Sequence, residues 1–228
     1  MAVGNAKLGI VVPTLDAAST LRRCVRALDE WRRRDLVVVD GGSVDGTPQL
    51  AEQLGARVIR APRGRGAQLA AGAAAAGGDW LLFLHADTVL ARGWARAVAS
   101  FVDASGNAER AGYFRFALDD RHKAARRLEA VVAWRARALG LPYGDQGLLI
   151  ARAFYERLGG HRPLPLMEDV DLVRRIGRRR LVALPVAATT SAERYRREGY
   201  LRRPARNLIC LAGYFAGVPP RTIQRLYG

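Results

Sequence analysis

Two aspartates directly follow buried apolar runs, and these positions favour a polar ligand. Asp87 comes just after the run 81–84, and Asp40 ends the run that begins at residue 36. Runs of four apolar residues are typical of strands buried in a parallel sheet. Because ligands of open α/β sheets bind outside the carboxyl ends of the strands, both carboxylates are expected at a crevice beside a polar ligand, a metal ion or both.

Two glycine-containing loops accompany these strands. Residues 41–47 read Gly-Gly-Ser-Val-Asp-Gly-Thr, and residues 63–68 read Arg-Gly-Arg-Gly-Ala-Gln before an alanine-rich segment. Glycine lets backbone approach a ligand, and a helix N-terminus favours anions. The second loop lacks the third glycine of a dinucleotide fingerprint and follows the third strand, which disfavours a Rossmann cofactor site. A diphosphate suits it, and ordinary exposed turns remain the alternative for both loops.

A third acidic group, Glu168-Asp169 with Asp171, opens a later helix. Acids at a helix N-terminus gain about 0.3–1 kcal/mol from the helix dipole, which explains them without any chemistry. A carboxylate in a cleft can also act as a general base toward a hydroxyl. His85 is either a structural histidine or a second metal ligand beside Asp87, since a divalent cation on a diphosphate needs only one or two protein carboxylates.

The elements that must position these residues alternate regularly in the first half of the chain. Strands are expected at 8–12, 36–39, 57–60 and 80–84, and helices at 19–31, 47–54 and 67–76. This order predicts an α/β fold with a parallel sheet and right-handed crossovers. In the second half we expect an edge or antiparallel strand at 113–118, strands at 147–150 and 181–184, helices at 121–140, 153–158 and from 168, and a helical tail over 195–227 broken by Pro219-Pro220.

The composition bounds the partners of the chain. Its 228 residues, half of them apolar, suffice for one sizeable domain. The formal charge of +16 is almost entirely arginine, because Lys7 and Lys123 are the only lysines. Such a charge favours nucleic acid, an anionic membrane or phosphorylated substrates, and a GC-rich genome explains it equally well.

Cys24 and Cys210 lack metal-ligand spacing and indicate free thiols in a reducing cytoplasm. Neither a signal peptide nor a spanning helix is expected.

Together and in this order, the motifs resemble those of family 2 glycosyltransferases of the GT-A fold. The resemblance covers residues 8–185. It rests on 11–15 (opening strand and nucleotide loop), 39–47 (D-x-x-S-x-D-G-T), 66–72 (the glycine- and alanine-containing helix), 84–87 (the place of D-x-D) and 168–169 (E-D). The stretches DGGS-DGT, FLHADT, YGDQG and PLMED are most similar to short bacterial members associated with radical-SAM gene clusters and arsenosugar biosynthesis.

The resemblance implies a single domain over residues 1–228, with a mostly parallel doubly wound sheet, helices on both faces and a helical C-terminal tail. Residues 8–110 would form a nucleotide-binding half, 111–190 an acceptor half and 191–228 the basic tail. A UDP-sugar would be bound by Pro13, Thr14, Asp16, Asp40, Gly42, Arg65, Gln68, His85, Ala86, Asp87 and Gln146.

Individual roles follow from the same resemblance. Asp40 would contact the nucleotide base, Arg65 would lie near the diphosphate, and Asp87 would bind Mg²⁺ or Mn²⁺. Asp169, with Glu168 beside it, would deprotonate an acceptor hydroxyl that attacks the anomeric carbon with inversion. Gln146 would touch the sugar or the acceptor. This assignment requires that Asp40, Asp87 and Asp169 converge on one cleft.

The sequence also departs from the family pattern. His85 stands at the first acid of D-x-D, which leaves metal dependence open. Q-x-x-R-W is missing and no spanning segment follows, so transfer of one sugar in the cytoplasm is favoured over processive synthesis. The arginines of the tail, with Tyr195, Tyr200 and Phe215, either contact a lipid-linked acceptor or the inner face of the membrane, or lie on a helix that packs on the domain. In that second case the packing residues would be Leu208, Ile209, Leu211 and Phe215.

Three other functions compete with sugar transfer. A nucleotidyltransferase shares the architecture, but Pro13-Thr14-Leu15-Asp16 occupies the place of its glycine- and lysine-bearing loop. A nucleic-acid-binding protein would account for the charge, yet no common recognition signature is present, and no nucleic-acid partner is expected. A catalytically silent GT-A-like domain on a membrane is the third alternative, which His85 keeps open.

Overall fold

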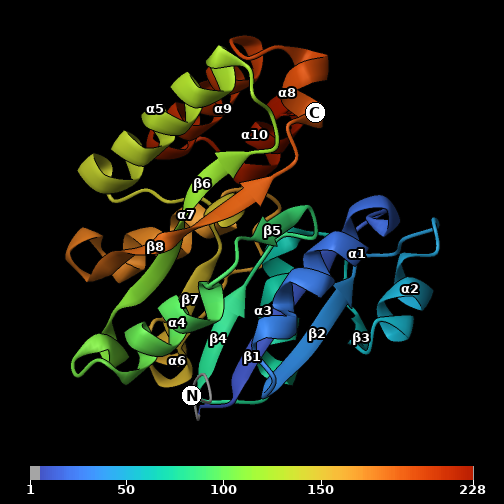
Figure 1. Cartoon of the computed structure of the whole chain (residues 1–228). Helices are drawn as coiled ribbons and strands as arrows, with labels where there is room; N and C mark the ends of the chain where they lie inside the picture. Colours follow the sequence, from blue (N-terminus) through green and yellow to red (C-terminus); the bar gives the residue numbers. More distant parts are fainter. Residues whose placement is uncertain (1–5, 228) are drawn as a thin grey trace.

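A single eight-stranded sheet, ordered β3-β2-β1-β4-β7-β6-β8-β5, forms the centre of the molecule, and helices cover both of its faces (Figure 1). The computed structural model describes residues 6–227. Four neighbouring strand pairs are parallel and three are antiparallel. The α/β class and the GT-A architecture expected from the sequence are confirmed.

The first half of the sheet is entirely parallel, as predicted. Its strands are β1 (Leu8–Thr14), β2 (Arg34–Asp40), β3 (Arg57–Arg60) and β4 (Trp80–Phe83), and its helices are α1 (Ala18–Ala27), α2 (Thr47–Gln53) and α3 (Arg65–Ala75). β1 is buried along its whole length, which is why its sequence does not alternate. Helix α3 approaches β1 closely, since a Cβ on Gly72 would lie 2.2 Å from Val11 Cγ1.

The second half of the sheet mixes directions. It contains β5 (Thr88–Leu90), β6 (Ala111–Leu118), β7 (Leu148–Ala151) and β8 (Leu181–Thr190). β7 inserts antiparallel between β4 and β6, and β6 runs parallel to β8. β6 pairs antiparallel with β7 only at Ala111 and Gly112, whereas residues 113–118 pair parallel with β8. The antiparallel interpretation of 113–118 is therefore wrong, and so is the edge interpretation, because β6 is an interior strand and β5 forms that edge.

Helices of this half lie against the mixed strands. They are α4 (Trp94–Asp103), α5 (Lys123–Leu139), α6 (Arg152–Arg157) and α7 (Glu168–Ile176), with short 3-10 turns at Leu28–Glu30, Asn107–Glu109, Gly144–Gln146 and Arg178–Arg180. β5 and α4 were not predicted from the sequence. α4 is nevertheless amphipathic in the usual way, burying Trp94, Val98 and Phe101.

The tail forms three helices, α8 (Glu193–Glu198), α9 (Arg202–Phe215) and α10 (Pro220–Tyr227). A second apolar cluster, separate from the main core, joins Cys210, Leu211 and Ile223 of the tail to Met167 and Val170 at the start of α7. The tail therefore covers the N-terminus of α7. No helix within residues 6–227 combines the length and apolar character needed to cross a bilayer.

The inward packing proposed for four tail residues is confirmed in full for one of them only. Leu211 is buried, with 7% of its surface exposed. Leu208 and Ile209 are 65% and 63% exposed and do not pack on the domain, while Phe215, 49% exposed, contacts it through the Arg174 guanidinium of α7, 4.8 Å from the centre of its ring. The face of α9 that packs on the domain is the one that carries Cys210 and Leu211, which differs from the face suggested by the sequence.

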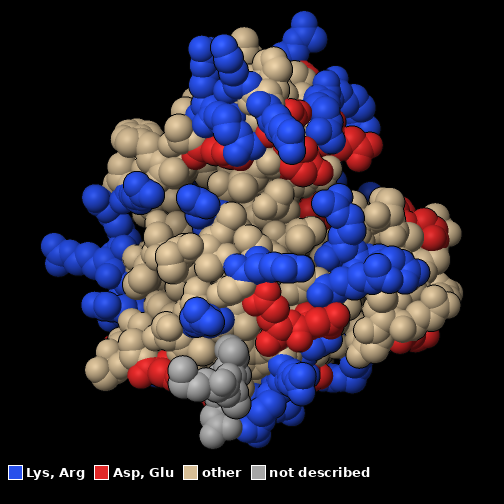
Figure 2. Space-filling view, viewed as in Figure 1, with Lys and Arg blue, Asp and Glu red and all other residues tan. Residues whose placement is uncertain are grey.

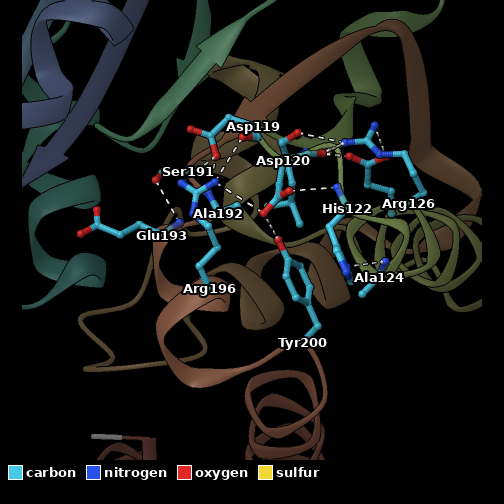
Figure 3. A network of polar contacts seen from close by, with 12 residues as sticks. Asp119, Asp120, His122, Ala124, Arg126, Ser191, Ala192, Glu193, Arg196 and Tyr200 are labelled. Atoms are coloured by element: carbon cyan, nitrogen blue, oxygen red, sulfur yellow. Dashed lines mark hydrogen bonds and ion pairs between the residues drawn. The ribbon is translucent and has the colours of Figure 1, made fainter.

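A polar network fixes the tail to the end of β6 (Figure 3). The carboxylate of Asp119 accepts a hydrogen bond from the backbone N–H of Ala192 at 2.6 Å, and Asp120 accepts one from the Tyr200 hydroxyl at 2.7 Å. Arg196 of α8 forms ion pairs with both aspartates at 3.5–3.8 Å. These contacts reach across more than 70 residues of sequence and define where α9 begins.

Candidate active site

A cavity lies beyond the end of β4, enclosed by segments that are far apart in the sequence. α3, the segment after β4, the turn before β7, the start of α7 and the tail all contribute to it. The polar and aromatic residues that line it are Arg65, His85, Asp87, Tyr143, Asp145, Glu168, Asp169, Thr190, Ser191, Arg194, Tyr195, Arg203, Asn207 and Tyr227.

Three carboxylates of the cavity each have one buried oxygen without a hydrogen-bond partner among the described residues. These atoms are Asp87 Oδ1, Asp145 Oδ1 and Glu168 Oε2. Asn207 adds a fourth such atom, its Oδ1. Buried polar atoms are nearly always hydrogen-bonded, because an unmade bond costs about 1–3 kcal/mol. Several of them around one cavity indicate that a ligand supplies the missing partners.

Arg65 lies among these carboxylates from the first turn of α3. Burial disfavours its charged form, but the surrounding carboxylates of Glu168, Asp169 and Asp87 outweigh burial and raise the guanidinium pKa. The sequence placed Arg65 near a diphosphate, and the structure places it in the same cavity as Asp87 and Asp169. It makes no close ion pair within residues 6–227, so its donors remain available to an anionic ligand.

Asp169 is held by two backbone groups at the start of α7. Its Oδ2 accepts a hydrogen bond from Gly144 N at 2.7 Å, and its Oδ1 accepts one from Val170 N at 2.7 Å. The two bonds join the N-terminus of α7 to the turn before β7 and direct the carboxylate at the cavity. This arrangement suits a group that must accept a proton from a bound hydroxyl.

Glu168, next to Asp169, lies in a drier environment. Only 1% of its surface is exposed. Burial, and then the negative charge of Asp169, raises the pKa of its carboxyl to about 7, while Arg65 partly opposes the shift. Adjacent carboxyl groups whose environments differ in this way are common at catalytic sites.

Asp145 stands on the turn between Tyr143 and β7, and its carboxyl is also perturbed. Burial raises its pKa to about 6; Arg135 opposes this shift, and the carboxylates of Asp169 and Asp87 add to it. Asp145 therefore shares an electrostatic environment with both acidic residues predicted from the sequence, although it was not itself predicted to belong to the site.

His85 is half-buried, and its imidazole is uncharged. Burial, reinforced by the positive charges of Arg65 and Arg194, lowers the imidazole pKa to about 3, against the attraction of Asp169. The turn before β7 packs closely on the ring, since a Cβ on Gly144 would lie 2.6 Å from His85 Nε2. Behind it, the Cys24 thiol donates to the His85 carbonyl oxygen at 3.6 Å, and burial raises the pKa of that thiol to about 12.

The other predicted residues lie at the carboxyl ends of β1 and β2, outside the cavity. Both oxygens of Asp40 are engaged by its own loop: Oδ2 accepts from Gly42 N at 2.9 Å and from Ser43 N at 3.0 Å, while Oδ1 accepts from the Ser43 hydroxyl. Asp16 accepts from Val44 N at 2.9 Å, which ties this loop to the one after β1. Pro13 and Thr14 end β1 and are buried.

Two predicted glutamines serve the fold. Gln68 donates to the carbonyl oxygens of Thr14 and Val39, both at 2.8 Å, and so bridges the ends of β1 and β2. Gln146, 1% exposed, donates to Phe114 O at 3.1 Å and does not line the cavity. The YGDQG stretch does reach the site, but through Tyr143 and Asp145. Ala86 is buried beside His85 and is not among the lining residues.

Of the three aspartates expected to converge, Asp87 and Asp169 line one cavity, and Asp40 lies at the same edge of the sheet outside it. The residues that sequence reasoning missed come from two places. Asp145 was within a stretch already noted, and its acidic side chain was the available signal. The tail contributes Arg194, Tyr195, Arg203, Asn207 and Tyr227, for which the sequence offered only a basic, aromatic composition.

The sheet order, the cavity at the end of β4 and the acidic start of α7 define the GT-A class of transferases. The model of glycosyl transferase family 2 matches residues 9–148, more than half of the chain. The chain belongs to this family, and the protein is a glycosyltransferase. No curated protein matches it.

Solved structures support the same fold. A mannosyltransferase from Pyrobaculum calidifontis, solved with GDP-Man and Mn²⁺, is 20% identical with a TM-score of 0.66, covering 97% of this chain and 68% of that one. TarS of S. aureus is 17% identical with a TM-score of 0.64, covering 90% of this chain. This chain spans 39% of TarS. Glucosyl-3-phosphoglycerate synthase of Mycobacterium tuberculosis, solved with Mn²⁺ and UDP, is 18% identical with a TM-score of 0.55, covering 82% of this chain and 71% of that one.

Proposed function

We propose that the protein transfers one sugar from a UDP-sugar to a hydroxyl acceptor, with inversion at the anomeric carbon. The observation that carries this proposal is the cavity itself, where Asp87, Asp145 and Glu168 leave buried oxygens unpartnered beside Arg65 and an oriented Asp169. The similar structures solved with UDP or GDP-Man support a nucleotide-sugar donor.

Two arginines are suited to the donor diphosphate. Arg65 faces the cavity from the start of α3, and Arg194 faces it from α8. Neither forms an ion pair with another described residue, in contrast to Arg203, whose guanidinium donates to Glu198 at 2.9 Å. Guanidinium groups stabilise the charge that develops on a departing diphosphate, because they are already oriented before the reaction begins.

The donor set fits a hard divalent cation. Asp87 and Asp145 offer carboxylate oxygens without partners, and Mg²⁺ or Mn²⁺ bound to a diphosphate needs only one or two such ligands from the protein. We assign the second carboxylate to Asp145, since His85 occupies the position of the usual first acid. When bound, the cation neutralises charge on the leaving nucleotide. No cluster of three metal-ligating side chains occurs among residues 6–227, so the diphosphate and water would complete the shell.

Asp169 is the proposed general base. Its hydrogen bonds to Gly144 N and Val170 N hold the carboxylate toward the cavity, where an acceptor hydroxyl would give up its proton. The oxygen of that hydroxyl then attacks the anomeric carbon as the bond to the diphosphate breaks. A single displacement of this kind inverts the configuration. Glu168 lies beside the base and retains a proton to higher pH.

The remaining expectations complete the proposal. Residues 8–110 would serve the nucleotide, with Pro13, Thr14, Asp40 and Gly42 around the base; residues 111–190 would serve the acceptor, and 191–228 would close the site. The protein would act in the cytoplasm, at the inner face of the membrane when its acceptor is lipid-linked. The YGDQG and PLMED stretches support a place among the radical-SAM-associated, arsenosugar-type members.

Titration calorimetry with UDP, with and without Mn²⁺, tests the proposal. Mn²⁺ should strengthen UDP binding at least tenfold in the native protein, and Asp87→Asn and Asp145→Asn should each abolish that gain. A thermal-shift screen of UDP-, GDP- and dTDP-sugars identifies the donor, because a ligand stabilises the state it binds. Failure of every nucleotide to bind would contradict the proposal. If Asp145→Asn keeps the full effect of Mn²⁺, Asp145 is not a ligand.

A further inference from the structure

One face of α9 is apolar and exposed along its whole length. Leu201, Leu208, Ile209 and Phe215 are 86%, 65%, 63% and 49% exposed. Ala205 and Ala212 are exposed on the same face, at the spacing of three and four residues that aligns side chains on a helix. Continuous apolar faces are uncommon on the surface of soluble proteins and mark places where something binds.

Packing within residues 6–227 accounts for only one end of this face, where the Phe215 ring lies 4.8 Å from the Arg174 guanidinium. The opposite face of α9 packs on the domain, through Cys210 and Leu211 in the second apolar cluster. Its position is also fixed, since the Asp119–Asp120 network holds the segment that leads into α9 (Figure 3). The helix therefore presents Leu208 and Ile209 outward as a property of the folded tail.

The tail that carries this face is rich in positive charge. Between residues 191 and 227 the chain carries eight arginines and two glutamates. Arg202, Arg221 and Arg225 form no ion pair with any other residue from 6 to 227. Figure 2 shows Lys and Arg side chains, with some Asp and Glu among them, over the end of the molecule where α5 and α8 lie.

Helix α5, at the same end of the molecule in Figure 1, repeats the pattern. Val131 and Trp134 are 59% and 61% exposed on it, and Arg127 and Arg137 lie to either side along the helix. Tryptophan and arginine next to aliphatic side chains are the composition of helices that lie in a membrane interface. The other three tryptophans, Trp31, Trp80 and Trp94, are buried.

We propose that the apolar face of α9, together with Val131 and Trp134 of α5, docks on an anionic lipid bilayer. The aliphatic side chains would enter the boundary between headgroups and acyl chains, and the arginines would meet the lipid phosphates. Charge complementarity selects this occupant over a second copy of the chain, because two copies would bring together surfaces that are both strongly positive.

The docking surface and the cavity share a helix. Arg203 and Asn207 of α9 line the cavity, while Leu208 and Ile209 lie on the outer face of the same helix. A bilayer bound to α9 would therefore lie next to the site. The inference about the acceptor rests on the proposed sugar transfer: a site next to the bilayer favours an acceptor whose hydroxyl is held at the membrane surface.

Vesicle binding tests the docking surface without any enzymatic readout. The purified 228-residue chain is mixed with phosphatidylcholine vesicles containing 30% or no phosphatidylglycerol, and binding is followed by flotation and by the tryptophan emission, to which the exposed Trp134 contributes. Binding to the anionic vesicles, with a blue shift, is expected, and 0.5 M NaCl should weaken it because salt screens exposed charges. Ile209→Asp and Leu208→Asp should each reduce the partition coefficient at least tenfold.

The matched control is Val44→Asp, which places the same charge at an apolar residue 92% exposed in the loop between β2 and α2. It should bind vesicles as the native protein does. Circular dichroism verifies that all variants fold.

Equal binding by Ile209→Asp and the native protein, or no binding to anionic vesicles, would overturn the proposal. Light scattering tests the alternative occupant. If the native protein is a dimer and the Ile209→Asp substitution dissociates it, the apolar face binds a second copy of the chain and the membrane proposal is overturned. UDP binding should be unchanged in Leu208→Asp and Ile209→Asp, so failure of the docking proposal leaves sugar transfer standing.

Discussion

The carboxyl ends of β2 and β4 look alike in sequence, each an apolar run followed by an aspartate, but the two aspartates are in opposite situations. Asp40 accepts three hydrogen bonds from Gly42 and Ser43 of its own loop, and these bonds lower its pKa despite burial. Asp87 has a buried oxygen with no partner among the described residues. Both oxygens of Asp40 are therefore engaged in hydrogen bonds within its loop, while Oδ1 of Asp87 can accept a hydrogen bond or bind a ligand.

This difference distinguishes a carboxylate that is hydrogen-bonded within its own loop from one that keeps an oxygen without a partner among the described residues. A carboxylate with all its partners inside the protein stabilises the loop that supplies them. A carboxylate kept unpartnered costs stability, and the carboxylates of Asp169 and Asp87 add to this cost at Asp145 by repulsion. Removing the two kinds of side chain should therefore change stability in opposite directions, which the following predictions test.

The largest effect is expected from Asp169→Asn. The amide oxygen can still accept from Gly144 N, so the fold and UDP affinity should persist, but the proton acceptor is lost. General-base catalysis contributes about 10²–10⁴-fold, and kcat should fall by that factor. The measurement is steady-state transfer with the donor identified by thermal shift. Transfer within threefold of the native rate would remove Asp169 from the role of base.

Asp40→Ala should mainly damage the fold. It leaves the N–H groups of Gly42 and Ser43 without their acceptor, and a loss of about 2–3 kcal/mol in the free energy of unfolding is expected by urea denaturation near neutral pH. Because the folded pKa is depressed, the difference should shrink as pH falls through and below the ordinary carboxyl value. Mn²⁺ binding by the folded variant should be unaffected. If Asp40→Ala instead loses Mn²⁺ binding while its stability is unchanged, Asp40 serves the ligand and does not stabilise the loop after β2.

Glu168→Gln should stabilise the protein at neutral and higher pH. The carboxyl pKa is raised from its ordinary 4.5 to about 7, so the unfolded chain releases its proton first as pH rises. The native protein therefore loses stability between about pH 4.5 and 7, and the glutamine variant escapes this loss. An advantage on the order of 2 kcal/mol is expected at pH 8, vanishing near pH 4. Parallel Tm values at every pH would contradict the raised pKa.

The smallest stability change is expected from Asp145→Asn. Removing this charge relieves repulsion with Asp87 and Asp169 and should stabilise the metal-free protein by on the order of 1 kcal/mol near pH 8. The same substitution should weaken Mn²⁺ binding, measured by calorimetry, so stability and binding move in opposite directions. A loss of both would place Asp145 with Asp40 among the structural carboxylates.

Much of the fold could be predicted because it depends on local pattern. The apolar runs that became β1, β2 and β4 are legible in the sequence, since strands buried on both faces do not alternate. β5 was missed because its three residues are too few to show a period. β6 was misplaced at an edge because its neighbour, β8, begins 63 residues after β6 ends, and pairing at that separation leaves no local trace.

The site was predicted only in part for a related reason. Asp87 and Asp169 could be found, because each stands at the end of a recognisable element. Whether a carboxylate is satisfied depends on its neighbours in space, so the sequence could not tell that Asp40 is consumed by its loop. Nor could it show that β7 inserts beside β4, which is what brings the turn with Asp145 to the cavity. The contribution of Arg203 likewise depends on which face α9 turns inward.

The two cysteines offer a consequence of practical value. The Cys24 thiol contacts the backbone of His85, and Cys210 lies on the buried face of α9; both thiols are buried and both have a raised pKa. Alkylating reagents attack only thiolates they can reach, so modification of either residue requires the chain over it to open. Mass spectrometry can resolve the rate of labelling at each cysteine. The rate at Cys24 would report on local opening around His85, and the rate at Cys210 on detachment of the C-terminal helices.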